Sequence, residues 1–153
     1  MTDRPATGQE LDELEATIDA WFRIQVAENP VVVTVERDGP GERRWFVRVK
    51  GEEKDVYTIR YHLRQRTLHY ETHFLPAPEE NPAELYGHLL RRNLKMYGGS
   101  FVIGDEDAVY LQGHLDRKMI TAEELDRVLG SMYSWVEQYF RPALRIGFAS
   151  RFA

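Results

Sequence analysis

Apolar residues recur every three to four positions in three segments of the chain, the spacing that gives a helix one apolar face. The first predicted helix runs from 9 to 28 and carries the stripe Leu11, Leu14, Ile18, Trp21, Phe22 and Val26. Acidic residues fill its other face, and those in the early turns suit the positive end of a helix dipole. Asn29-Pro30 ends this helix, because the residue before a proline avoids helical backbone angles.

Two further segments carry start and stop signals of helices. Asn81-Pro82 supplies an N-cap and a proline at the first helical position, and Gly98-Gly99 ends that segment. Thr121 and Glu124 have the spacing of a capping box, and Arg141-Pro142 closes the third helix. The third helix is predicted to bury the stripe Leu125, Val128, Leu129, Met132, Trp135, Val136 and Tyr139.

Strand-like alternation occupies much of the rest of the chain. The predicted strands are 31–37, 43–50, 55–63, 66–75, 100–103 and 108–113. In the second of these, Phe46 is the one apolar residue that falls among the polar positions, and 38–41 has the composition of a turn. The order α-β-β-β-β-α-β-β-α predicts an α+β fold with a mostly antiparallel sheet and helices packed on one face.

The third and fourth strands are predicted to form a hairpin with an even number of loop residues. An even count puts the apolar side chains of both strands on one face, whereas a slip of one residue turns one strand over. A two-residue loop of Arg64 and Gln65 pairs Tyr61 with Leu68 and Arg60 with His69. A four-residue loop is the alternative, since the segment lacks the glycine that favours the shortest hairpin turns.

Length and composition fit one globular domain, because a chain of 153 residues is ordinary for a single core. We expect a flexible N-terminus over 1–8, a single domain over 9–148 and a C-terminal tail over 149–153. The chain has no cysteine, which excludes a disulfide framework, a thiolate metal site and a cysteine nucleophile.

The charge and hydropathy pattern narrows the possible partners. A net charge of -5 argues against a nucleic-acid partner, since domains that bind nucleic acid usually present a basic surface. No apolar run approaches the roughly 20 residues of a membrane span, and the first ten residues lack an apolar signal core. These features predict a cytoplasmic protein with no membrane partner.

Several motifs in the C-terminal half together carry a family resemblance. They are Asn93, Phe101, the turn 104–107, Tyr110, Leu111, the helix start 121–125, Pro142 and Leu144. The run 97–148 resembles the YbjN-like domain family of bacteria, in particular its actinobacterial branch. That family is linked to sensory transduction regulation and is similar in fold to the type III secretion chaperones, which work as dimers and hold extended client segments. The resemblance implies a binding or dimerising role and no catalytic residues.

His69, Glu71 and His73 share one face of the fourth predicted strand and are the main candidates for chemistry. On strand geometry, neighbours two positions apart lie roughly 6.6 Å from each other. Zinc prefers three or four closely fixed ligands, so this face is predicted to be a solvated or interface-lining surface rather than a metal site. A surface whose contacts respond to pH is a further alternative, because histidine titrates near neutrality.

Other polar motifs also favour a structural role. The consecutive acids at 105–107 lack the spaced oxygen ligands of a calcium-binding EF-hand, and His114 has no recognisable triad partners. The glycines at 98, 99 and 104 match no phosphate-binding motif. We therefore predict no catalytic residue, no metal ligand and no cofactor.

The apolar stripe of the second helix is the other candidate site. It comprises Leu85, Tyr86, Leu89, Leu90, Leu94 and Met96, a face wider than contact with one sheet needs. Either this helix also contacts a second subunit, or it is more fully buried within the monomer. The aromatic residues of the hairpin are predicted to be mostly core, with a groove for an extended segment as the alternative. They are Tyr57, Tyr61, Tyr70 and Phe74.

These observations lead to one main functional hypothesis. We expect a non-enzymatic, chaperone-like or regulatory module that forms a homodimer and binds a protein or peptide partner, by strand addition or through an apolar groove. The alternative is a small-ligand or metal-binding sensor or enzyme that uses the His69, Glu71 and His73 face, with Arg60 binding an anion. A purely structural subunit of a larger assembly is a third possibility.

Overall fold

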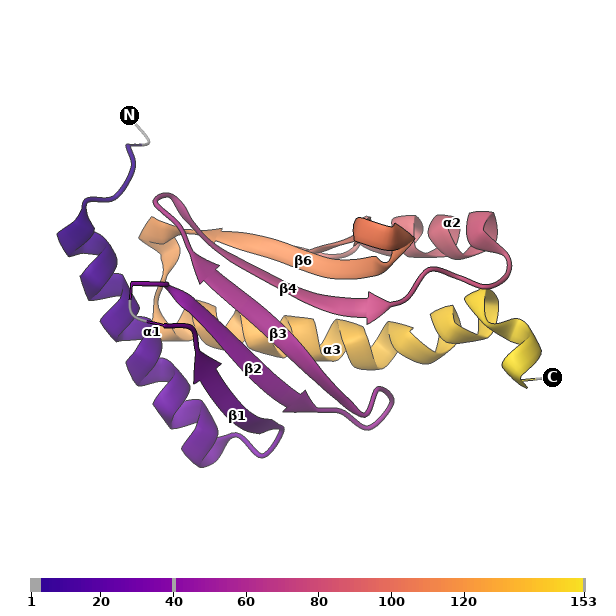
Figure 1. The fold of residues 1–153 in the computed structure, drawn as a ribbon, viewed down its shortest axis with the longest axis horizontal. Coiled ribbons are helices and arrows are strands. Elements are labelled where there is room, and N and C mark those ends of the chain that lie inside the picture. The colour runs from indigo at the N-terminus through magenta and orange to yellow at the C-terminus, as the bar shows by residue number, and fades with distance from the viewer. Residues whose placement is uncertain (1–3, 40, 153) are drawn as a thin grey trace.

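The computed structural model describes residues 4–39 and 41–152 and has the predicted α+β architecture (Figure 1). Its elements are α1 (Gly8–Glu28), β1 (Val32–Arg37), β2 (Arg44–Lys50), β3 (Val56–Leu63), β4 (Thr67–Leu75), α2 (Pro82–Asn93), β5 (Ser100–Ile103), η1 (Asp105–Asp107), β6 (Val109–Asp116), η2 (Arg117–Met119), α3 (Ala122–Gly147) and η3 (Ala149–Phe152). Three predicted segments fall partly outside the described residues: the N-terminus at 1–3, the turn 38–41 at residue 40 and the tail at residue 153.

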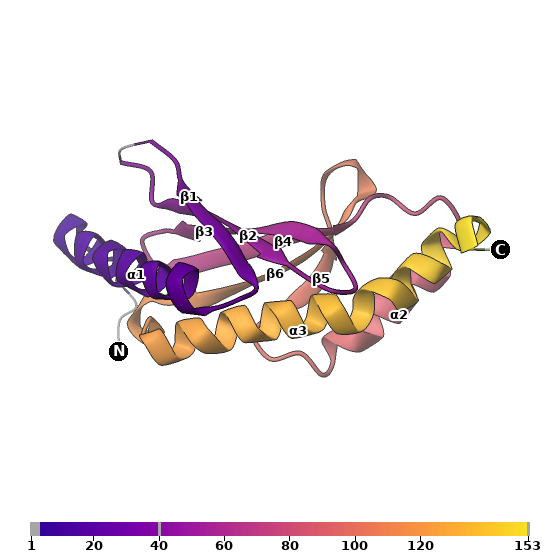
Figure 2. The ribbon, with the colours of Figure 1, turned by 90° about the horizontal axis from the view of Figure 1, so that it is seen from below.

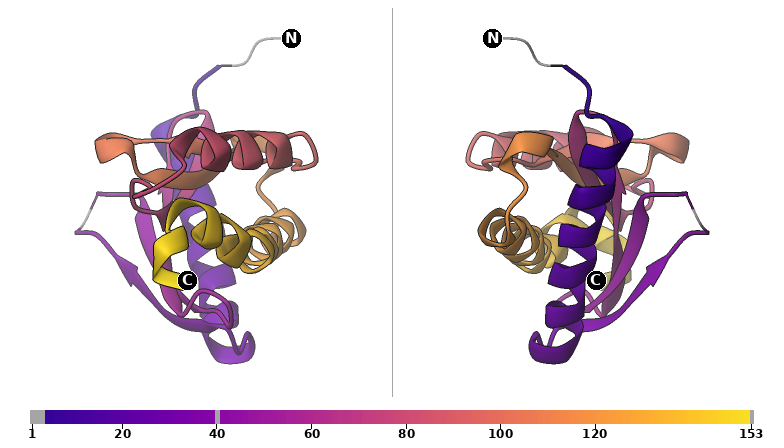
Figure 3. Two further views of the ribbon diagram at one scale, coloured as in Figure 1. Left: turned by 90° about the vertical axis from the view of Figure 1, so that its right-hand side faces the viewer. Right: turned by 90° about the vertical axis from the view of Figure 1, so that its left-hand side faces the viewer.

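The strands form one sheet in the order β1-β2-β3-β4-β6-β5, and neighbouring strands pair antiparallel throughout. Figure 2 shows α1 and α3 on the same side of this sheet, with α2 beside the C-terminal half of α3. The views in Figure 3 look along the molecule and show the same layering of helices against strands. One face of the sheet is therefore covered by helices, and the other is an open face in the described part of the chain.

The pairing of β3 with β4 confirms the even loop and shows which alternative holds. Leu63 lies opposite Leu68 and Tyr61 lies opposite Tyr70, so four residues separate the paired leucines. The register of the shorter loop, with Tyr61 opposite Leu68, is wrong by two residues. The observed turn is closed by the backbone N–H of Arg64, which donates to the carbonyl of Thr67 at 2.8 Å.

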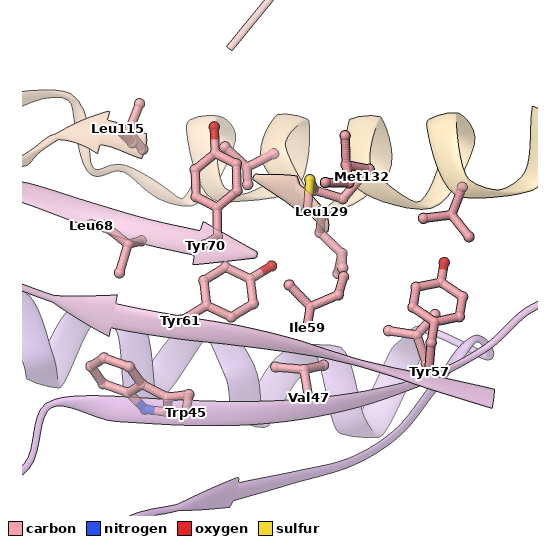
Figure 4. Close-up of a cluster of buried hydrophobic side chains, with 14 of the residues drawn as sticks. Trp45, Val47, Tyr57, Ile59, Tyr61, Leu68, Tyr70, Leu115, Leu129 and Met132 are labelled. Atoms are coloured by element: carbon pink, nitrogen blue, oxygen red, sulfur yellow. The ribbon is translucent and has the colours of Figure 1, made fainter. Parts of the chain in front are cut away.

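The covered face of the sheet and α3 bury each other. Figure 4 shows Tyr57, Ile59 and Tyr61 of β3 on the side of the sheet that faces Leu129 and Met132 of α3. The four hairpin aromatics are confirmed as core, each at most 5% exposed: Tyr57, Tyr61, Tyr70 and Phe74. An open aromatic groove on this face is therefore excluded, because α3 already fills it.

Two buried tyrosine hydroxyls differ in whether they have a hydrogen-bond partner. The Tyr70 hydroxyl donates to the carbonyl of Gly98 at 2.6 Å. The Tyr61 hydroxyl is buried without a hydrogen-bond partner among the described residues. Burial also raises the pKa of Tyr61, because the charged phenolate is disfavoured away from water.

The third helix is longer than predicted. It continues through Pro142 to Gly147, so the prediction that Arg141-Pro142 closes it is wrong. The backbone N–H groups of Glu79 and Glu80 both donate to the carbonyl of Gly147, at 2.9 Å. These donors satisfy a carbonyl that a helix end leaves free and so stabilise the turn that follows the proline.

The second helix begins and ends differently from the prediction. Asn81 precedes it with a left-handed φ of 50°, and its side chain donates to the carbonyl of Ile146 at 3.0 Å instead of capping α2. The helix ends at Asn93, well before Gly98-Gly99, and the Asn93 side chain binds the backbone of β5. Contacts to distant segments therefore set both ends.

Capping of the other two helices also departs from the prediction. The Thr121 hydroxyl accepts from the backbone of Glu124 at 3.1 Å, but the Glu124 carboxylate contacts Arg127 at 2.9 Å, so half of the predicted box forms. At α1, by contrast, a complete capping box forms that the sequence pattern did not predict. Thr7 and Glu10 exchange hydrogen bonds of 2.9 and 3.2 Å there.

Glu137 of α3 holds the loop between β2 and β3. Its carboxylate accepts hydrogen bonds from the backbone N–H groups of Glu52 at 2.5 Å, Glu53 at 3.1 Å and Lys54 at 3.2 Å. Glycine is required at position 51, because a Cβ on Gly51 would lie 2.2 Å from the carbonyl oxygen of Lys54. The loop therefore owes its shape to a helix far away in sequence.

Replacing Tyr70 with phenylalanine should lower the free energy of unfolding by about 1 kcal/mol, because it leaves the Gly98 carbonyl without its donor. Tyr61→Phe is the matched control. It removes a buried hydroxyl that has no partner in the described chain, so it should be neutral or slightly stabilising. Urea unfolding measures the free energy of unfolding of both variants. An equal loss of stability in the two would contradict the conclusion that the Tyr70 hydroxyl makes a stabilising hydrogen bond and the Tyr61 hydroxyl does not.

Replacing Glu137 with glutamine should lower the free energy of unfolding by about 1–2 kcal/mol, because an amide oxygen accepts weaker hydrogen bonds than a carboxylate. Glu36→Gln removes the same charge from an exposed position on β1 and should change it by less than about 0.5 kcal/mol. Chemical denaturation separates the two variants. A Glu137 variant as stable as the Glu36 variant would show that the loop does not depend on this carboxylate.

Candidate functional site

The predicted stripe of α2 divides into a buried part and an exposed part. Leu85 and Leu89 are buried against the rest of the chain, as is Met96 in the turn that follows. Leu90 is 63% exposed and Leu94 is 88% exposed. Tyr86, the sixth predicted residue, is half-buried. Half of the stripe therefore belongs to the core of the monomer, and the rest faces outward.

An apolar groove of about 310 Å³ lies between α2 and β5. Its lining is Tyr86, Leu89, Leu90, Phe101, Val102, Ile103 and Val109. We call the outward-facing part of this region the α2–β5 surface, defined by Tyr86, Leu90, Val102 and Ile103 of the lining together with Leu94, which follows α2. The sequence pattern did not predict the β5 side of this surface. The signal was Ile103, which is apolar at the end of a short strand and is 54% exposed.

Asn93 pairs with the outer edge of β5. Its Oδ1 accepts from the backbone N–H of Phe101 at 2.7 Å, and its Nδ2 donates to the Phe101 carbonyl at 3.2 Å. The side-chain amide thus takes the place that the backbone of an added strand would occupy. Strand addition at this point is blocked, so any partner at the α2–β5 surface would have to contact the side chains of the groove.

Charged residues of opposite sign lie beside the two ends of α2. The Tyr86 hydroxyl lies 3.4 Å from the carbonyl of Asp107, which places the acidic turn of η1 beside the first half of α2. Arg91 and Arg92 lie in the last turn of α2, next to the Asn93 contact with β5. Acidic residues therefore lie beside the first half of α2 and basic residues in its last turn, while the groove between α2 and β5 is lined by apolar residues.

The open face of the sheet holds the predicted histidine site, with a corrected pairing. His62, rather than Arg60, lies opposite His69, and His114 lies opposite His69 on its other side. Arg60 instead lies opposite Glu71, and its guanidinium contacts that carboxylate at 2.6 Å. The error follows directly from the loop register, because a shift of two residues exchanges every partner across the hairpin.

His69, Glu71 and His73 do not converge on one point. Glu71 is paired with Arg60, and the ring of His73 lies 5.4 Å from the ring of Tyr110. Burial lowers the pKa of both His69 and His73, which favours the neutral imidazoles. No group of three histidine or acidic side chains in the described ranges is arranged to hold a metal ion.

The acidic turn uses its residues for conformation. Glu106 and Asp107 both have φ near 58°, a left-handed geometry that aspartate and asparagine tolerate better than most residues. All three acids of the turn are exposed. His114 is exposed within β6, which extends to Asp116, beyond its predicted end at 113. The turn and His114 thus occupy separate parts of the surface.

Comparison with known proteins identifies the family. The YbjN family model, described as "Putative bacterial sensory transduction regulator", matches residues 25–145. Uncharacterized proteins of Mycobacterium bovis and Mycobacterium tuberculosis are each 30% identical over 114 residues, which cover 74% of this chain and 62% of theirs. An uncharacterized protein of Mycobacterium leprae is 29% identical over 110 residues, covering 72% of this chain and 60% of its own.

The chain thus spans about three-fifths of the length of these mycobacterial relatives. Among the residues that the structure describes, no helix has the length and apolarity to cross a membrane. The family match extends from α1 nearly to the end of α3 and so includes every strand of the sheet. On this match and the mycobacterial relatives, the chain belongs to the YbjN family.

Proposed function

We propose that this chain is a non-enzymatic regulatory or chaperone-like module that acts as a homodimer and binds a protein or peptide partner. The observation that carries the proposal is the α2–β5 surface, where Leu90 and Leu94 stand exposed beside an apolar groove. Fully burying a leucine side chain contributes about 1.5–3 kcal/mol, so a surface with two of them gains from being covered. The regulator description of the family supports the regulatory part.

A second copy of the chain is the occupant that best fits this surface. A two-fold axis that runs across the groove places the same patch of both copies in contact and brings opposite ends of the groove together. The acidic end at Asp105–Asp107 of one copy would then face Arg91 and Arg92 of the other, twice over. Complementary charge of this kind selects the register of an interface and excludes wrong partners.

The closed edge of β5 also favours side-chain contact between copies. Asn93 occupies the Phe101 backbone, so a continuous sheet across two copies would require that pair to break. Packing the grooves together keeps the pair intact and covers Leu90 and Ile103 at once. A stable interface needs roughly 1,000 Å² or more of total buried surface, which requires α2, β5 and the η1 turn to take part together.

In such a dimer, a protein or peptide partner would bind to surfaces outside the dimer interface. Tyr97, in the loop after α2, is 77% exposed and lies under the guanidinium of Arg127, 5.0 Å from its ring. Exposed aromatic side chains beside arginine are the residue types that contribute most to protein interfaces. They support a protein or peptide as the class of partner.

Leu90→Glu should convert the dimer to a monomer, because two carboxylates would be buried across the two-fold axis without partners. Light scattering after size exclusion measures the mass. Ile24→Glu is the matched control, since Ile24 is also a helical aliphatic residue, 53% exposed on α1. The control should remain dimeric. A monomeric wild-type chain, or a Leu90→Glu variant that is still dimeric, would refute the proposed interface.

Charge reversal at the two ends of the groove tests whether the two copies pack with their grooves antiparallel. The variant with Arg91→Glu and Arg92→Glu should dimerise less well than wild type, as should the variant with Asp105→Lys and Glu106→Lys. A mixture of the two should form heterodimers beyond the statistical share, because both contacts across the axis then pair opposite charges. Native mass spectrometry counts the species. A purely statistical mixture would contradict the antiparallel arrangement.

A further inference from the structure

The strands β3 and β4 separate at one end, and the sheet is split there. Their pairing stops at Ile59 and Thr72, although β3 begins at Val56 and β4 continues to Leu75. Figure 1 shows the two strands diverging, with α3 crossing behind the gap. The pairing of β4 with β6 is also irregular between His73 and Leu75, so β4 bends at this point.

Side chains take over backbone hydrogen bonds at the split. The Thr72 hydroxyl donates to the carbonyl of Thr58 at 2.7 Å, and the Lys54 ammonium donates to the carbonyl of Phe74 at 2.8 Å. Both carbonyls lie where β3 and β4 would otherwise have continued their ladder. The separation is therefore stabilised by specific contacts and is a built feature of the fold.

The split opens a hollow of about 620 Å³ that reaches the open face of the sheet. Its lining is Phe46, Lys54, Val56, Tyr57, Thr58, Arg60, Thr72, His73 and Tyr110. This volume lies within the range of roughly 300–1,000 Å³ that holds small ligands in proteins. The α2–β5 surface shares no residue with this lining.

The charge in the hollow is positive. Lys54 and Arg60 contribute to the lining, and the lining residues include no acidic side chain. Glu71 is already paired with Arg60, and the Glu137 carboxylate accepts from the backbone N–H of Lys54 rather than from its ammonium. Lys54 has no ion-pair partner in the described chain, and its ammonium lies 4.9 Å from the ring centre of Phe140. Burial lowers the pKa of Lys54 to about 8, since desolvation disfavours the ammonium.

Lys54 is held in position before any ligand arrives. The Glu137 carboxylate binds the backbone of Lys54 and of the two residues before it, and Gly51 permits the tight approach. A site whose charged group is already fixed loses little conformational entropy on binding. An ammonium that is half-buried, fixed and without an acidic partner is the arrangement that an anion would stabilise.

Aromatic side chains flank the hollow on both sides. Phe46 comes from β2, and it is the residue that breaks the alternation of that strand by placing an aromatic ring on the open face. Tyr110 comes from β6 and packs edge-on against His73, with ring centres 5.4 Å apart. The walls thus offer apolar surface to a ligand, while the cations occupy the split.

We propose that this hollow binds a small organic anion, a carboxylate or phosphate carried on a flat apolar body. Lys54 and Arg60 contact the anionic group, and Phe46 and Tyr110 contact the apolar body. Arg60 can do so by turning from Glu71, an exposed pair that holds it weakly.

Titration of the full chain with phenyl phosphate, benzoate, inorganic phosphate and phenol tests the proposal, at constant ionic strength. Backbone amide shifts in two-dimensional NMR spectra are the readout. Phenyl phosphate and benzoate should shift the amides of Thr58 and His73 and saturate at or below roughly 10 mM, the weak end of specific binding. Inorganic phosphate should bind about tenfold more weakly, because it buries no apolar surface.

Two variants connect the binding to the hollow. Lys54→Gln keeps a donor for the Phe74 carbonyl but removes the charge, so it should weaken phenyl phosphate binding about tenfold. Val56→Trp places a large side chain at a position that is 40% exposed in the lining, and it should abolish binding without removing a cation. Lys50→Met is the matched control on exposed β2 surface and should bind as wild type does.

Several outcomes would overturn the proposal. They are no saturable shift with either organic anion, equal weakening in the Lys50 and Lys54 variants, or undiminished binding by Val56→Trp. Equal affinity for inorganic phosphate and phenyl phosphate would overturn the role of Phe46 and Tyr110. Saturable binding of phenol alone would show that the hollow recognises the ring and not the anion.

Discussion

The packing of α3 against the tyrosine-rich face of the sheet is the contact on which the rest of the structure depends. Tyr57, Tyr61 and Tyr70 share that face because strand side chains alternate, and large aromatic rings dominate the energy of a core. The same helix positions two distant segments. Glu137 holds the β2–β3 loop, and the last turn packs closely on α2, where a Cβ on Gly147 would lie 3.0 Å from Leu85.

Both candidate surfaces follow from where that packing ends. Beyond α3, the apolar stripe of α2 has more width than the core can cover, so Leu90 and Leu94 remain exposed. At the other surface, β3 and β4 separate in front of α3, and the Lys54 ammonium reaches the Phe74 carbonyl of β4. One helix therefore organises an apolar surface at the edge of the sheet and a cationic hollow on its open face.

Pattern predicts this fold well wherever the signal is local. Alternation predicts each strand and the shared face of the hairpin, and the even number of loop residues is confirmed, with four residues rather than two between the paired leucines. Local signals failed where a distant contact decided the outcome. Pro142 suggested a helix end, yet donors from Glu79 and Glu80 sustain another turn. Asn93 belongs to the motifs of the family resemblance, but the sequence pattern does not predict that its side chain pairs with the backbone of Phe101 across the intervening turn.

The sequence by itself determined the class of the fold, the order of its elements and the face of the sheet on which the apolar side chains of the β3–β4 hairpin lie. These properties depend on neighbours within a turn of helix or a few strand positions, which a linear pattern contains. The tertiary structure alone decided which half of the α2 stripe is exposed, that Asn93 closes the edge of β5, and that Lys54, Phe46 and Tyr110 line one hollow. Those outcomes depend on strand register, strand separation and helix contacts between segments far apart in the chain, which no local pattern contains.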